Sequence, residues 1–444
     1  MGLGIRFHES RMTRPAGHGY TASPTMQGNR LALYWHSFFL AVTVSFTEVN
    51  TVMPALILEA GGGEGTVGIL TGIMRGLPLI SQLLFASFLH SRDLKKPFLL
   101  LGINLRVVAL AAAAAGIAFI GTDQAIIPVV FITMSVFSLS GAFAGVSYTE
   151  IMGKVVEMAH RRTFFVNRQT ATALGLLVSA VATRLFLGTT SFPHGYVLLF
   201  IMASGFLLVA SGGFWVLREP AGRALNASRD AAASAGRPGF LEALKEVPGI
   251  ISSDTNMRAL IVAVNLGALG FTAIPLITAR AHAAYDLMPA AVGSFVLVQV
   301  AGMLVANWVW SRTIRRGGFR LVLRAELILI ALLFPLSLLA AQYAPLWAYT
   351  GIYFLVGSVL SAHKLGVEAI LVQISPNARR ALYAGVFGAA NLGTALMPPA
   401  TGALARSVGF TAVFAGAALL ALLALVPAGR IDCGEWYKAE SEPN

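Results

Sequence analysis

Residues 66–96 read TVGILTGIMRGLPLISQLLFASFLHSRDLKK, a long apolar run followed at once by a short basic segment. A helix needs about 20 mostly apolar residues to cross a hydrocarbon core of about 30 Å, and the run at 66–90 is long enough. Because no water reaches the backbone in lipid, each amide needs a partner within its own segment, so the run is expected to be helical. The basic segment at 91–96 then marks the boundary with water.

Similar apolar runs recur along the chain. Apolar residues make up 56% of the 444 residues and charged residues only 12%, whereas soluble chains usually carry about 25% charged residues. The fold class expected is therefore an all-α integral membrane protein with about twelve transmembrane helices. The predicted spans are 31–59, 66–90, 97–120, 125–152, 164–188, 195–217, 256–280, 288–311, 319–341, 345–373, 380–405 and 409–429.

Basic residues lie mostly on one side of these spans. The net charge is +12, and the lysines and arginines stand in short segments between apolar runs, which is the pattern of cytoplasmic loops. The opposite loops carry little more than Arg184, Arg280 and Arg406. With an even number of spans, both termini are expected in the cytoplasm, and the bacterial inner membrane is the expected location. The absence of a basic, polar domain argues against nucleic-acid binding.

The longest loop divides the chain into two halves. The expected parts are a cytoplasmic N-terminal tail, a first six-helix bundle, a cytoplasmic central loop, a second six-helix bundle and a cytoplasmic C-terminal tail. Their boundaries are 1–30, 31–217, 218–255, 256–430 and 431–444.

The two halves resemble each other. The segment SRDLKK at 91–96 follows the second span, and SRTIRR at 311–316 follows the eighth, 220 residues later. Glu150 and Glu368, which are 218 residues apart, each precede a pair of arginines by 11 and 12 residues. Two independent pairs with nearly the same offset indicate a duplicated six-span unit. Parallel repeats of this kind form two bundles around a central cavity.

At this point the chain resembles the major facilitator superfamily of secondary transporters over residues 31–430. The family motif after the second span reads approximately G-x-L-a-D-R-x-G-R-K, and residues 87–96 here read SFLHSRDLKK. The leucine and the basic residues are kept, while Ser91 and Leu94 replace the expected aspartate and glycine. The resemblance implies two pseudo-symmetric six-helix bundles that rock around a central site.

The resemblance also implies ion pairs between basic loops and acidic helix ends that close the cytoplasmic side. Such pairs would form when this side closes and break when it opens; the alternative is that each acid is a solvated charge at a helix end. The candidate gate residues are Arg92, Lys95, Glu150, Arg161, Arg162, Arg312, Arg315, Glu368, Arg379 and Arg380.

Two charges near the middle of the first and second spans are candidates for substrate or ion binding. Glu48 and Arg75 both lie roughly 13–17 Å from the same membrane surface, at about 1.5 Å per helical residue. The positions one repeat later, Gly267 and Ser294, are uncharged, which favours a role outside the duplicated framework. A buried ion pair could join the two spans. Otherwise Glu48 would bind a proton or a cation, or Arg75 an anionic substrate.

Prolines mark two places where polar residues are expected to face the cavity. Asn50 lies shortly before Pro54 in the first span, and Thr272 lies shortly before Pro275 in the seventh. Proline frees a backbone carbonyl and can bend a helix at a cavity, although a packing kink without ligand contact is the alternative. The other candidates are polar residues inside later spans, namely Gln299, His363, Lys364 and Asn391.

The roles of these later residues stay open. His363 could relay protons at physiological pH or only hydrogen-bond a neighbour, and Lys364 needs water or a carboxylate such as Glu326 or Glu368. Arg106 and Glu326 hold equivalent places in the third and ninth spans, near the cytoplasmic side. We expect both to reach water there.

No enzymatic motif is found. A phosphate-binding G-x-x-x-x-G-K-[ST] loop and a His-Glu-x-x-His pair are both missing, and Cys433 is the single cysteine. We therefore expect no enzyme activity, metal or cofactor. The predicted function is secondary active transport of a small solute by a monomer in the lipid bilayer, with protons as the candidate coupling ion. The alternatives are a non-transporting membrane sensor or assembly partner, and, less favoured, an enzyme acting on lipid.

Overall fold

The computed structural model describes residues 24–90, 92, 94–119, 123–156, 161–219, 248–285, 287–376 and 380–432. The regular structure in these ranges is helical. The first half of the chain contains α1 (Pro24–Phe46), α2 (Val52–Glu59), α3 (Glu64–His90), α4 (Lys96–Phe119), α5 (Asp123–Val155), α6 (Arg161–Thr189) and α7 (His194–Val216). The second half contains α10 (Thr255–Ala273), α11 (Pro275–Ala284), α12 (Pro289–Tyr343), α13 (Leu346–Thr350), α14 (Ile352–Ile374), α15 (Arg380–Ala390), the 3₁₀ helix η3 (Leu392–Leu396) and α16 (Met397–Arg430).

These helices follow the twelve predicted spans. Eight described segments are each long and apolar enough to cross a membrane, and those at Pro289–Tyr343 and Leu382–Arg430 hold 55 and 49 residues, enough for two crossings each. Each of the two reverses at a glycine, Gly318 with φ 69° and Gly409 with φ 84°. Positive φ suits glycine because it lacks a Cβ atom. Spans eight and nine, and spans eleven and twelve, are therefore each joined without a long loop.

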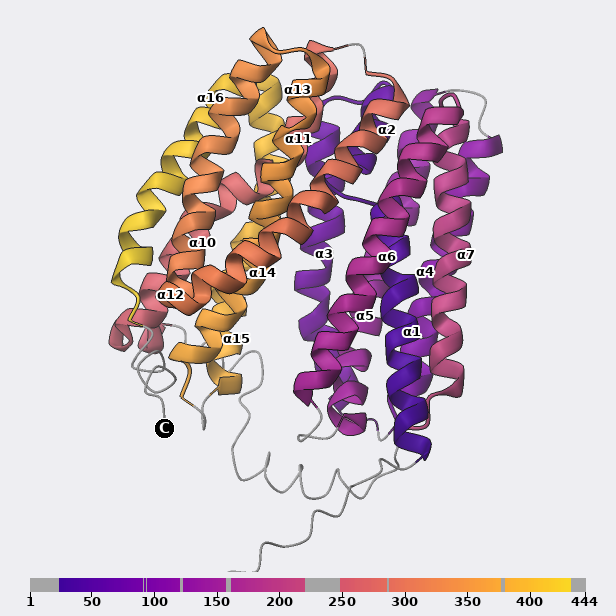
Figure 1. Ribbon diagram of the computed structural model, residues 1–444, viewed down its shortest axis with the longest axis vertical. Coiled ribbons are helices and arrows are strands. Elements are labelled where there is room, and N and C mark those ends of the chain that lie inside the picture. Colours follow the sequence, from indigo (N-terminus) through magenta and orange to yellow (C-terminus); the bar gives the residue numbers. More distant parts are fainter. Residues whose placement is uncertain are drawn as a thin grey trace, which may run out of the picture.

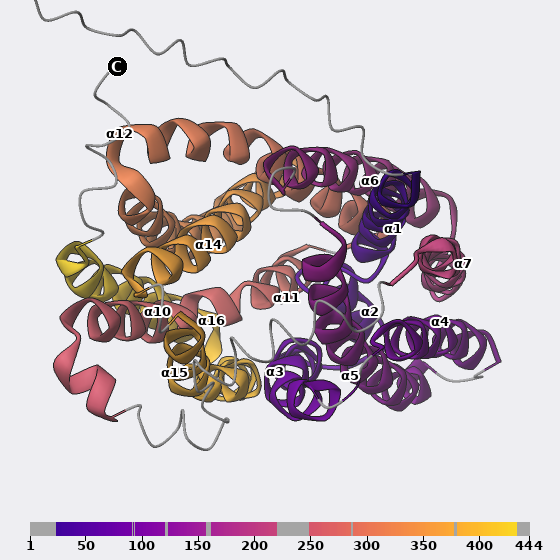
Figure 2. The ribbon, with the colours of Figure 1, turned by 90° about the horizontal axis from the view of Figure 1, so that it is seen from below.

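The helices form two bundles that lie side by side, α1–α7 in one and α10–α16 in the other (Figures 1 and 2). Each bundle has its own packed apolar core, although three valines of α12 join the core of the first bundle. Helix α1 begins and α16 ends at the lower end in Figure 1, which we call the terminal end; the opposite end is the distal end.

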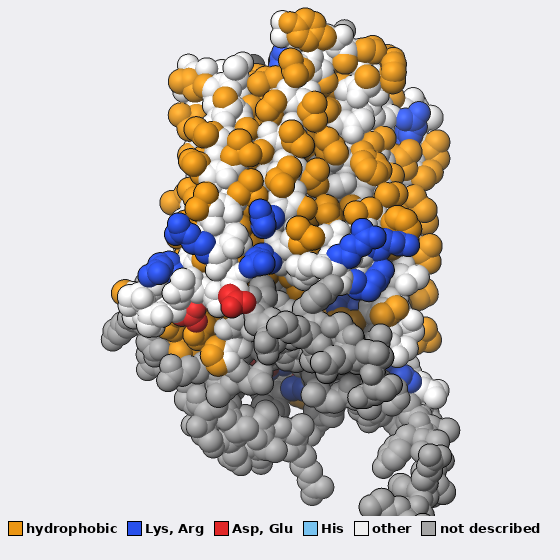
Figure 3. Space-filling view, turned by 60° about the vertical axis from the view of Figure 1, so that its left-hand side comes forward, with side chains coloured by type: hydrophobic (Ala, Val, Ile, Leu, Met, Phe, Trp, Pro, Cys, Tyr) orange, Lys and Arg blue, Asp and Glu red, His pale blue; other side chains and the backbone are white. Residues whose placement is uncertain are grey.

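The outer surface agrees with a membrane setting. Figure 3 shows hydrophobic side chains over most of the displayed face, with lysines and arginines gathered mainly toward the terminal end. Large apolar side chains such as Ile132, Leu208 and Leu332 are more than half exposed. Exposure of such side chains is unfavourable in water but not in lipid.

The two bundles touch along their distal halves. Helix α3 packs on α16, α6 packs on α12, and α2 packs on α11. Small residues allow the backbones to approach closely, as expected for helices packed in lipid. A Cβ atom on Gly68 would lie 2.5 Å from the Pro398 carbonyl oxygen, and one on Gly293 would lie 2.5 Å from the Arg184 Cα atom.

Two spans are broken near their middle. The first span stops as a helix at Phe46 and restarts at Val52, and the seventh is interrupted at Ile274. Pro54 and Pro275 follow the breaks and cannot donate a backbone hydrogen bond to the residue four positions earlier. These interruptions position the candidate site described next.

Candidate functional site

Glu48 lies in the break of the first span and binds the turn that follows it. Its carboxylate accepts hydrogen bonds from the backbone N–H of Asn50 at 2.5 Å, from the Asn50 side-chain amide at 2.7 Å and from the Thr51 hydroxyl at 3.1 Å. These donors belong to the two residues that precede α2, and the Glu48 backbone carbonyl accepts from the Met53 N–H of that helix at 3.0 Å. Glu48 therefore holds the turn that leads into the restarted helix.

Asn50 joins Glu48 to Arg75. The side-chain amide of Asn50 donates to Glu48, and its oxygen accepts a hydrogen bond of 2.6 Å from the Arg75 guanidinium. The two charges are therefore linked through an amide, and no direct ion pair joins them in the described structure. Asn50 is almost fully buried, so this link is shielded from solvent.

The two prolines leave carbonyls that are used across the bundle interface. Pro54 leaves the Asn50 carbonyl without its helical partner, and the hydroxyl of Thr278 on α11 donates to that oxygen at 2.7 Å. Pro275 likewise leaves the Phe271 carbonyl, which accepts a hydrogen bond of 3.2 Å from Arg75 on α3. Each bundle thus supplies one freed carbonyl and one donor to the other.

Arg75 connects Glu48 and Asn50 to aromatic and charged residues of the second bundle. The Arg75 guanidinium lies 4.8 Å from the centre of the Phe271 ring, a cation–π distance. His363, midway along α14, stacks on the same ring with 4.2 Å between ring centres. His363 Nδ1 and Glu326 Oε1 share a hydrogen bond of 2.7 Å. Glu48, Asn50, Arg75, Phe271, His363 and Glu326 thus form one line of contacts, which we call the charged series, in which the Phe271 ring joins Arg75 to His363.

Glu326 is the deepest carboxylate of this series. Its side chain is 3% exposed, whereas that of His363 is 33% exposed. The second carboxylate oxygen, Oε2, is buried and has no hydrogen-bond partner. A cavity of about 10 Å³ lined by Glu326, His363, Phe271 and Gly267 adjoins it, close to the minimum of roughly 10–15 Å³ for one water. Contrary to the sequence-based expectation, Glu326 does not reach water at a helix end, because His363 holds it inside.

Known structures identify this arrangement of helices. No protein-family model and no curated protein sequence matches the chain. Among solved structures, the chain is similar to the nucleoside transporter NupG with a TM-score of 0.67 and 12% identity, covering 91% of this chain and 99% of that one. The chain has the major facilitator fold.

Two further structures support the same fold. A POT family transporter in complex with 5-aminolevulinic acid gives a TM-score of 0.65 at 12% identity, covering 92% of this chain and 98% of that one. The peptide transporter POT in complex with alafosfalin gives 0.63 at 15% identity, covering 90% and 94%. The series from Glu48 to Glu326 crosses between the two bundles at the contact of Arg75 with Phe271, next to the breaks in the first and seventh spans.

The remaining substrate candidates lie on the second bundle. The Thr272 hydroxyl donates to the Leu269 carbonyl of its own helix. Gln299 is buried and its Oε1 atom has no hydrogen-bond partner. Asn391 lies between α15 and η3 and accepts a hydrogen bond of 2.9 Å from Asn265 of α10. These contacts hold the second bundle together and connect none of these side chains to Arg75.

Lys364 and Glu368 are exposed on α14. Within the described ranges, no carboxylate lies within 4.0 Å of Lys364 and no basic group lies that close to Glu368. Glu326, one of the two partners considered for Lys364, is bound to His363 instead. Lys364 therefore stands beside the charged series without joining it.

Four gate candidates fall wholly or partly outside the described structure. Arg379 lies outside the described residues, as do the side chains of Arg161, Arg162 and Arg380. The predicted pairs of Glu150 and Glu368 with these arginines thus remain predictions.

The other gate candidates of the first bundle make contacts within that bundle. Lys95 is 1% exposed, lies 3.7 Å from Glu150 and donates to the Leu89 carbonyl and, at 2.5 Å, to that of Arg92. Arg92 stacks its guanidinium on the ring of Phe88. Since these partners all belong to the first bundle, the contacts fasten its own loop and do not join the two bundles.

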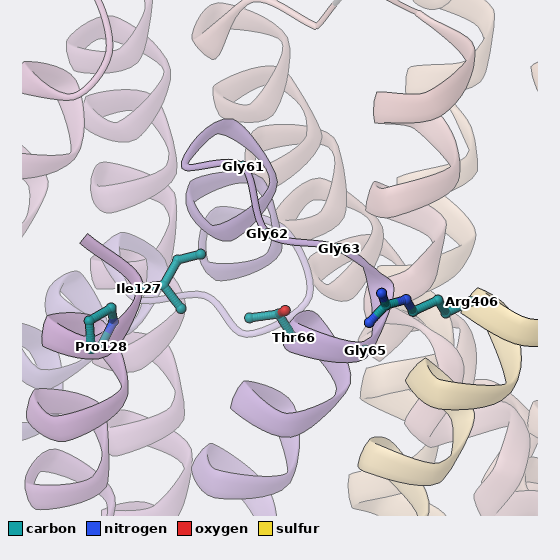
Figure 4. Close-up of a pocket in the computed structure, with 8 residues that line it drawn as sticks. All are labelled: Gly61, Gly62, Gly63, Gly65, Thr66, Ile127, Pro128 and Arg406. Carbon is teal, nitrogen blue, oxygen red and sulfur yellow. The ribbon is translucent and has the colours of Figure 1, made fainter. Parts of the chain in front are cut away.

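A separate cavity opens at the distal end. It measures about 550 Å³ and is lined by the glycine-rich loop at 61–63, the start of α3, the region of Pro128 and Arg406. Figure 4 shows Arg406 of α16 pointing toward the start of α3 near Gly65. The cavity contains no residue of the charged series, so we do not assign it to the central site.

Sequence reasoning missed three residues of the site. Phe271, Thr278 and Tyr353 carry no charge, yet Phe271 contacts Arg75 and His363, and Thr278 also shares a 2.7 Å hydrogen bond with Tyr353. A signal for Phe271 was available, because it stands four residues before Pro275. Thr278 and Tyr353 had no such signal, since their partners are distant in sequence.

Proposed function

We propose that this chain is a secondary active transporter, and neither an enzyme nor a sensor, that moves a small solute across the bacterial inner membrane by alternating access. The terminal end would face the cytoplasm, as the lysine and arginine distribution suggests. The observation that carries the proposal is the reciprocal pair of hydrogen bonds between the bundles, Thr278 to Asn50 and Arg75 to Phe271. A transporter must break such contacts each time it opens its distal side.

The described contacts fit a state that is closed at the distal end. The hydrogen bonds that cross between bundles join Arg75 to Phe271, Thr278 to Asn50, and Arg184 to Ser294. In the terminal half, the hydrogen bonds found among described residues stay within one bundle, as between Asn265 and Asn391. We therefore assign this arrangement to the inward-facing state.

The energies suit a reversible gate. A hydrogen bond between neutral groups contributes about 0.5–1.5 kcal/mol and one to a charged group about 1.5–3 kcal/mol. The two reciprocal bonds together are thus worth a few kcal/mol, which differential binding of a solute can overcome. A much stronger contact would hold the transporter in one state.

We assign the central solute site to the space beside Arg75 and His363. Both side chains remain partly exposed although each lies in the middle of its helix. They come from different bundles and share the Phe271 ring. A solute that binds both would sense the distance between the bundles, which is the requirement for coupling binding to the transition.

We assign proton coupling to Glu326 and His363. A buried carboxylate oxygen without a partner can be satisfied by taking up a proton and donating to a water, and the adjoining cavity of about 10 Å³ is close to the minimum volume for one water. His363 is exposed enough to pass the proton between Glu326 and the space between the bundles. Glu48, in contrast, already accepts three hydrogen bonds, so neither of its carboxylate oxygens lacks a partner.

The transport proposal is tested with purified protein in two steps. A thermal-shift screen in detergent should find a stabilising solute, because a ligand that binds the folded state raises its stability. The panel should include 5-aminolevulinic acid, alafosfalin and nucleosides, which the names of the similar structures suggest. Liposomes containing the protein should then take up the stabilising solute. A stabilising solute that never enters such liposomes would argue for a sensor.

Proton coupling is tested in the same liposomes with and without a pH gradient. Glu326→Gln should abolish accumulation driven by the gradient and keep the exchange of labelled for unlabelled solute, which needs no net proton movement. Glu64→Gln, which replaces a carboxylate in the first turn of α3 at the distal end, is the control and should accumulate solute normally. Glu48→Gln should retain gradient dependence. If Glu326→Gln still accumulates solute and Glu48→Gln does not, the coupling site is Glu48.

A further inference from the structure

The hairpin between the eighth and ninth spans carries five closely spaced arginines. Arg312, Arg315 and Arg316 lie at the end of the eighth span, and Arg320 and Arg324 follow the turn at Gly318. All five are exposed. Within the described ranges, no carboxylate lies within 4.0 Å of any of them. The hairpin thus concentrates positive charge that its own bundle leaves uncompensated.

The equivalent hairpin of the first bundle is different. Lys96 donates to the carbonyls of Trp215 and Leu217, and Lys95 to those of Leu89 and Arg92. Glu219 accepts from the backbone N–H groups of both lysines and from the Lys154 side chain. The basic groups of the first hairpin are therefore hydrogen-bonded to neighbouring residues of the same half of the chain. In the second hairpin, among the described contacts, Arg320 donates to the Ile431 carbonyl and Arg312 donates weakly, at 3.4 Å, to the Trp308 carbonyl of its own helix.

Two of the arginines lie on the lipid-facing surface. Arg312 and Arg324 stand six residues before and after Gly318, so each lies roughly 9 Å along its helix from the turn. Arg324 lies in the exposed stripe that contains Leu321 and Ile328. The Arg312 guanidinium folds back over the ring of Trp308, 3.2 Å from its centre, and Trp308 is 61% exposed.

The positions of Arg312, Arg324 and Trp308 indicate which class of molecule binds to the hairpin. An arginine that leans toward the apolar surface is costly without an anion, and exposed tryptophans mark the level of lipid headgroups. Guanidinium groups bind phosphate oxygens through paired hydrogen bonds. We propose that Arg312 and Arg324, supported by Arg315 and Arg316, bind the phosphate groups of anionic glycerophospholipids in the leaflet at the terminal end.

The site is independent of the solute pathway. Arg312 and Arg324 face outward from the second bundle, and neither contacts a residue of the series from Glu48 to Glu326. A bound lipid would neutralise the hairpin and fix the depth of the second bundle in the membrane. It would do so whether or not the solute site works as proposed.

The test uses the full chain purified in a neutral detergent, with lipid added at increasing concentration. Phosphatidylglycerol should raise the melting temperature at lower concentration than phosphatidylcholine, and inorganic phosphate should have no effect. Each arginine near a membrane surface adds about fivefold in affinity for anionic lipid, so Arg312→Gln with Arg324→Gln should weaken phosphatidylglycerol binding roughly 25-fold.

The matched control is Arg258→Gln with Arg430→Gln, which removes two exposed charges from the same end of the same bundle. It should change the affinity less than about threefold. If the first double variant does not fold, Arg312→Lys with Arg324→Lys keeps the charge, loses the paired hydrogen bonds and should weaken binding severalfold. Equal losses in the glutamine variant and the control, or no loss in either, would overturn the proposal. A loss of solute uptake in pure phosphatidylcholine liposomes would instead assign Arg312 to a gate.

Discussion

The breaks in the first and seventh spans use the same device with different donors. Pro54 and Pro275 are 221 residues apart, close to the spacing of the repeated loops, and each frees the carbonyl four residues earlier. The donor to Asn50 is the neutral hydroxyl of Thr278, whereas the donor to Phe271 is the Arg75 guanidinium. The duplicated unit therefore supplies two equivalent acceptors, and the donors differ between the halves.

The two donors differ in their surroundings: the Thr278 contact lies in a packed core, whereas the Arg75 contact lies beside the proposed solute site. Thr278 is fully buried and also bonded to Tyr353, so its contact forms part of a packed core. Arg75 is partly exposed, is held by Asn50 and touches the ring shared with His363. A change of charge near His363 or a bound anion would act directly on Arg75, and it would reach Thr278 only through Asn50, which contacts both.

The largest effect is expected from Arg75→Gln, which removes the charged donor. Losing a hydrogen bond to a charged group costs about 1.5–3 kcal/mol, so the distal side should open about 10- to 100-fold more often. The measurement is labelling of Ala395→Cys, which packs against Gly76 across the interface, by an impermeant maleimide in a Cys433→Ser background. An unchanged labelling rate would show that Arg75 does not hold the distal side closed.

Pro275→Ala tests the acceptor of the same bond. An alanine N–H can bond the Phe271 carbonyl within its own helix and so competes with Arg75. We expect labelling of Ala395→Cys to rise about tenfold, less than with Arg75→Gln because the contact of Arg75 with the Phe271 ring remains. A rise larger than that of Arg75→Gln would mean that the kink itself closes the interface.

Thr278→Val keeps the shape of the side chain and removes the neutral donor. A neutral hydrogen bond contributes about 1 kcal/mol, so labelling should rise about fivefold and the melting temperature in detergent should fall by a few degrees. Tyr353→Phe removes only the second partner of Thr278 and should have a smaller effect on labelling. Equal effects of Arg75→Gln and Thr278→Val would remove the distinction between the two breaks.

Pro54→Ala is expected to have the smallest effect. The new N–H could bond the Asn50 carbonyl, but Glu48 already fixes the turn through Asn50 and Thr51, so the break should persist. We expect less than about threefold faster labelling, measured as above. A tenfold rise would show that the proline, and not the hydrogen bonds of the Glu48 carboxylate, maintains the break in the first span.

Sequence reasoning located the spans and several members of the site. The twelve apolar runs agree with the helices because each run must satisfy its own backbone hydrogen bonds in lipid, a local requirement. Glu48, Asn50 and Arg75 were named for their charge or polarity in the membrane. The sequence left a direct ion pair between Glu48 and Arg75 open. Their connection through Asn50 was not predicted, because a straight first helix would not turn the Glu48 carboxylate toward Asn50 and Thr51.

The placement of Glu326 shows the limit of reading depth from sequence. Its position near the cytoplasmic end of the ninth span predicted contact with water, yet the side chain turns inward to His363, 37 residues away in the chain. Depth along a helix follows from residue number, whereas the direction of a side chain depends on which helix packs against it. The same reason explains why Thr278 and Tyr353 escaped notice.

The sequence alone determined that the chain folds in a lipid bilayer and that it has twelve helical segments. It also determined the repeat that places a proline in the first and seventh segments. These features follow from the composition of single segments and from their spacing. Only the tertiary structure decided that the Asn50 amide stands between Glu48 and Arg75, and that each freed carbonyl meets a donor of the opposite bundle. Such contacts join residues up to 228 positions apart, and hydrogen bonds of about 3 Å form only after two bundles have packed.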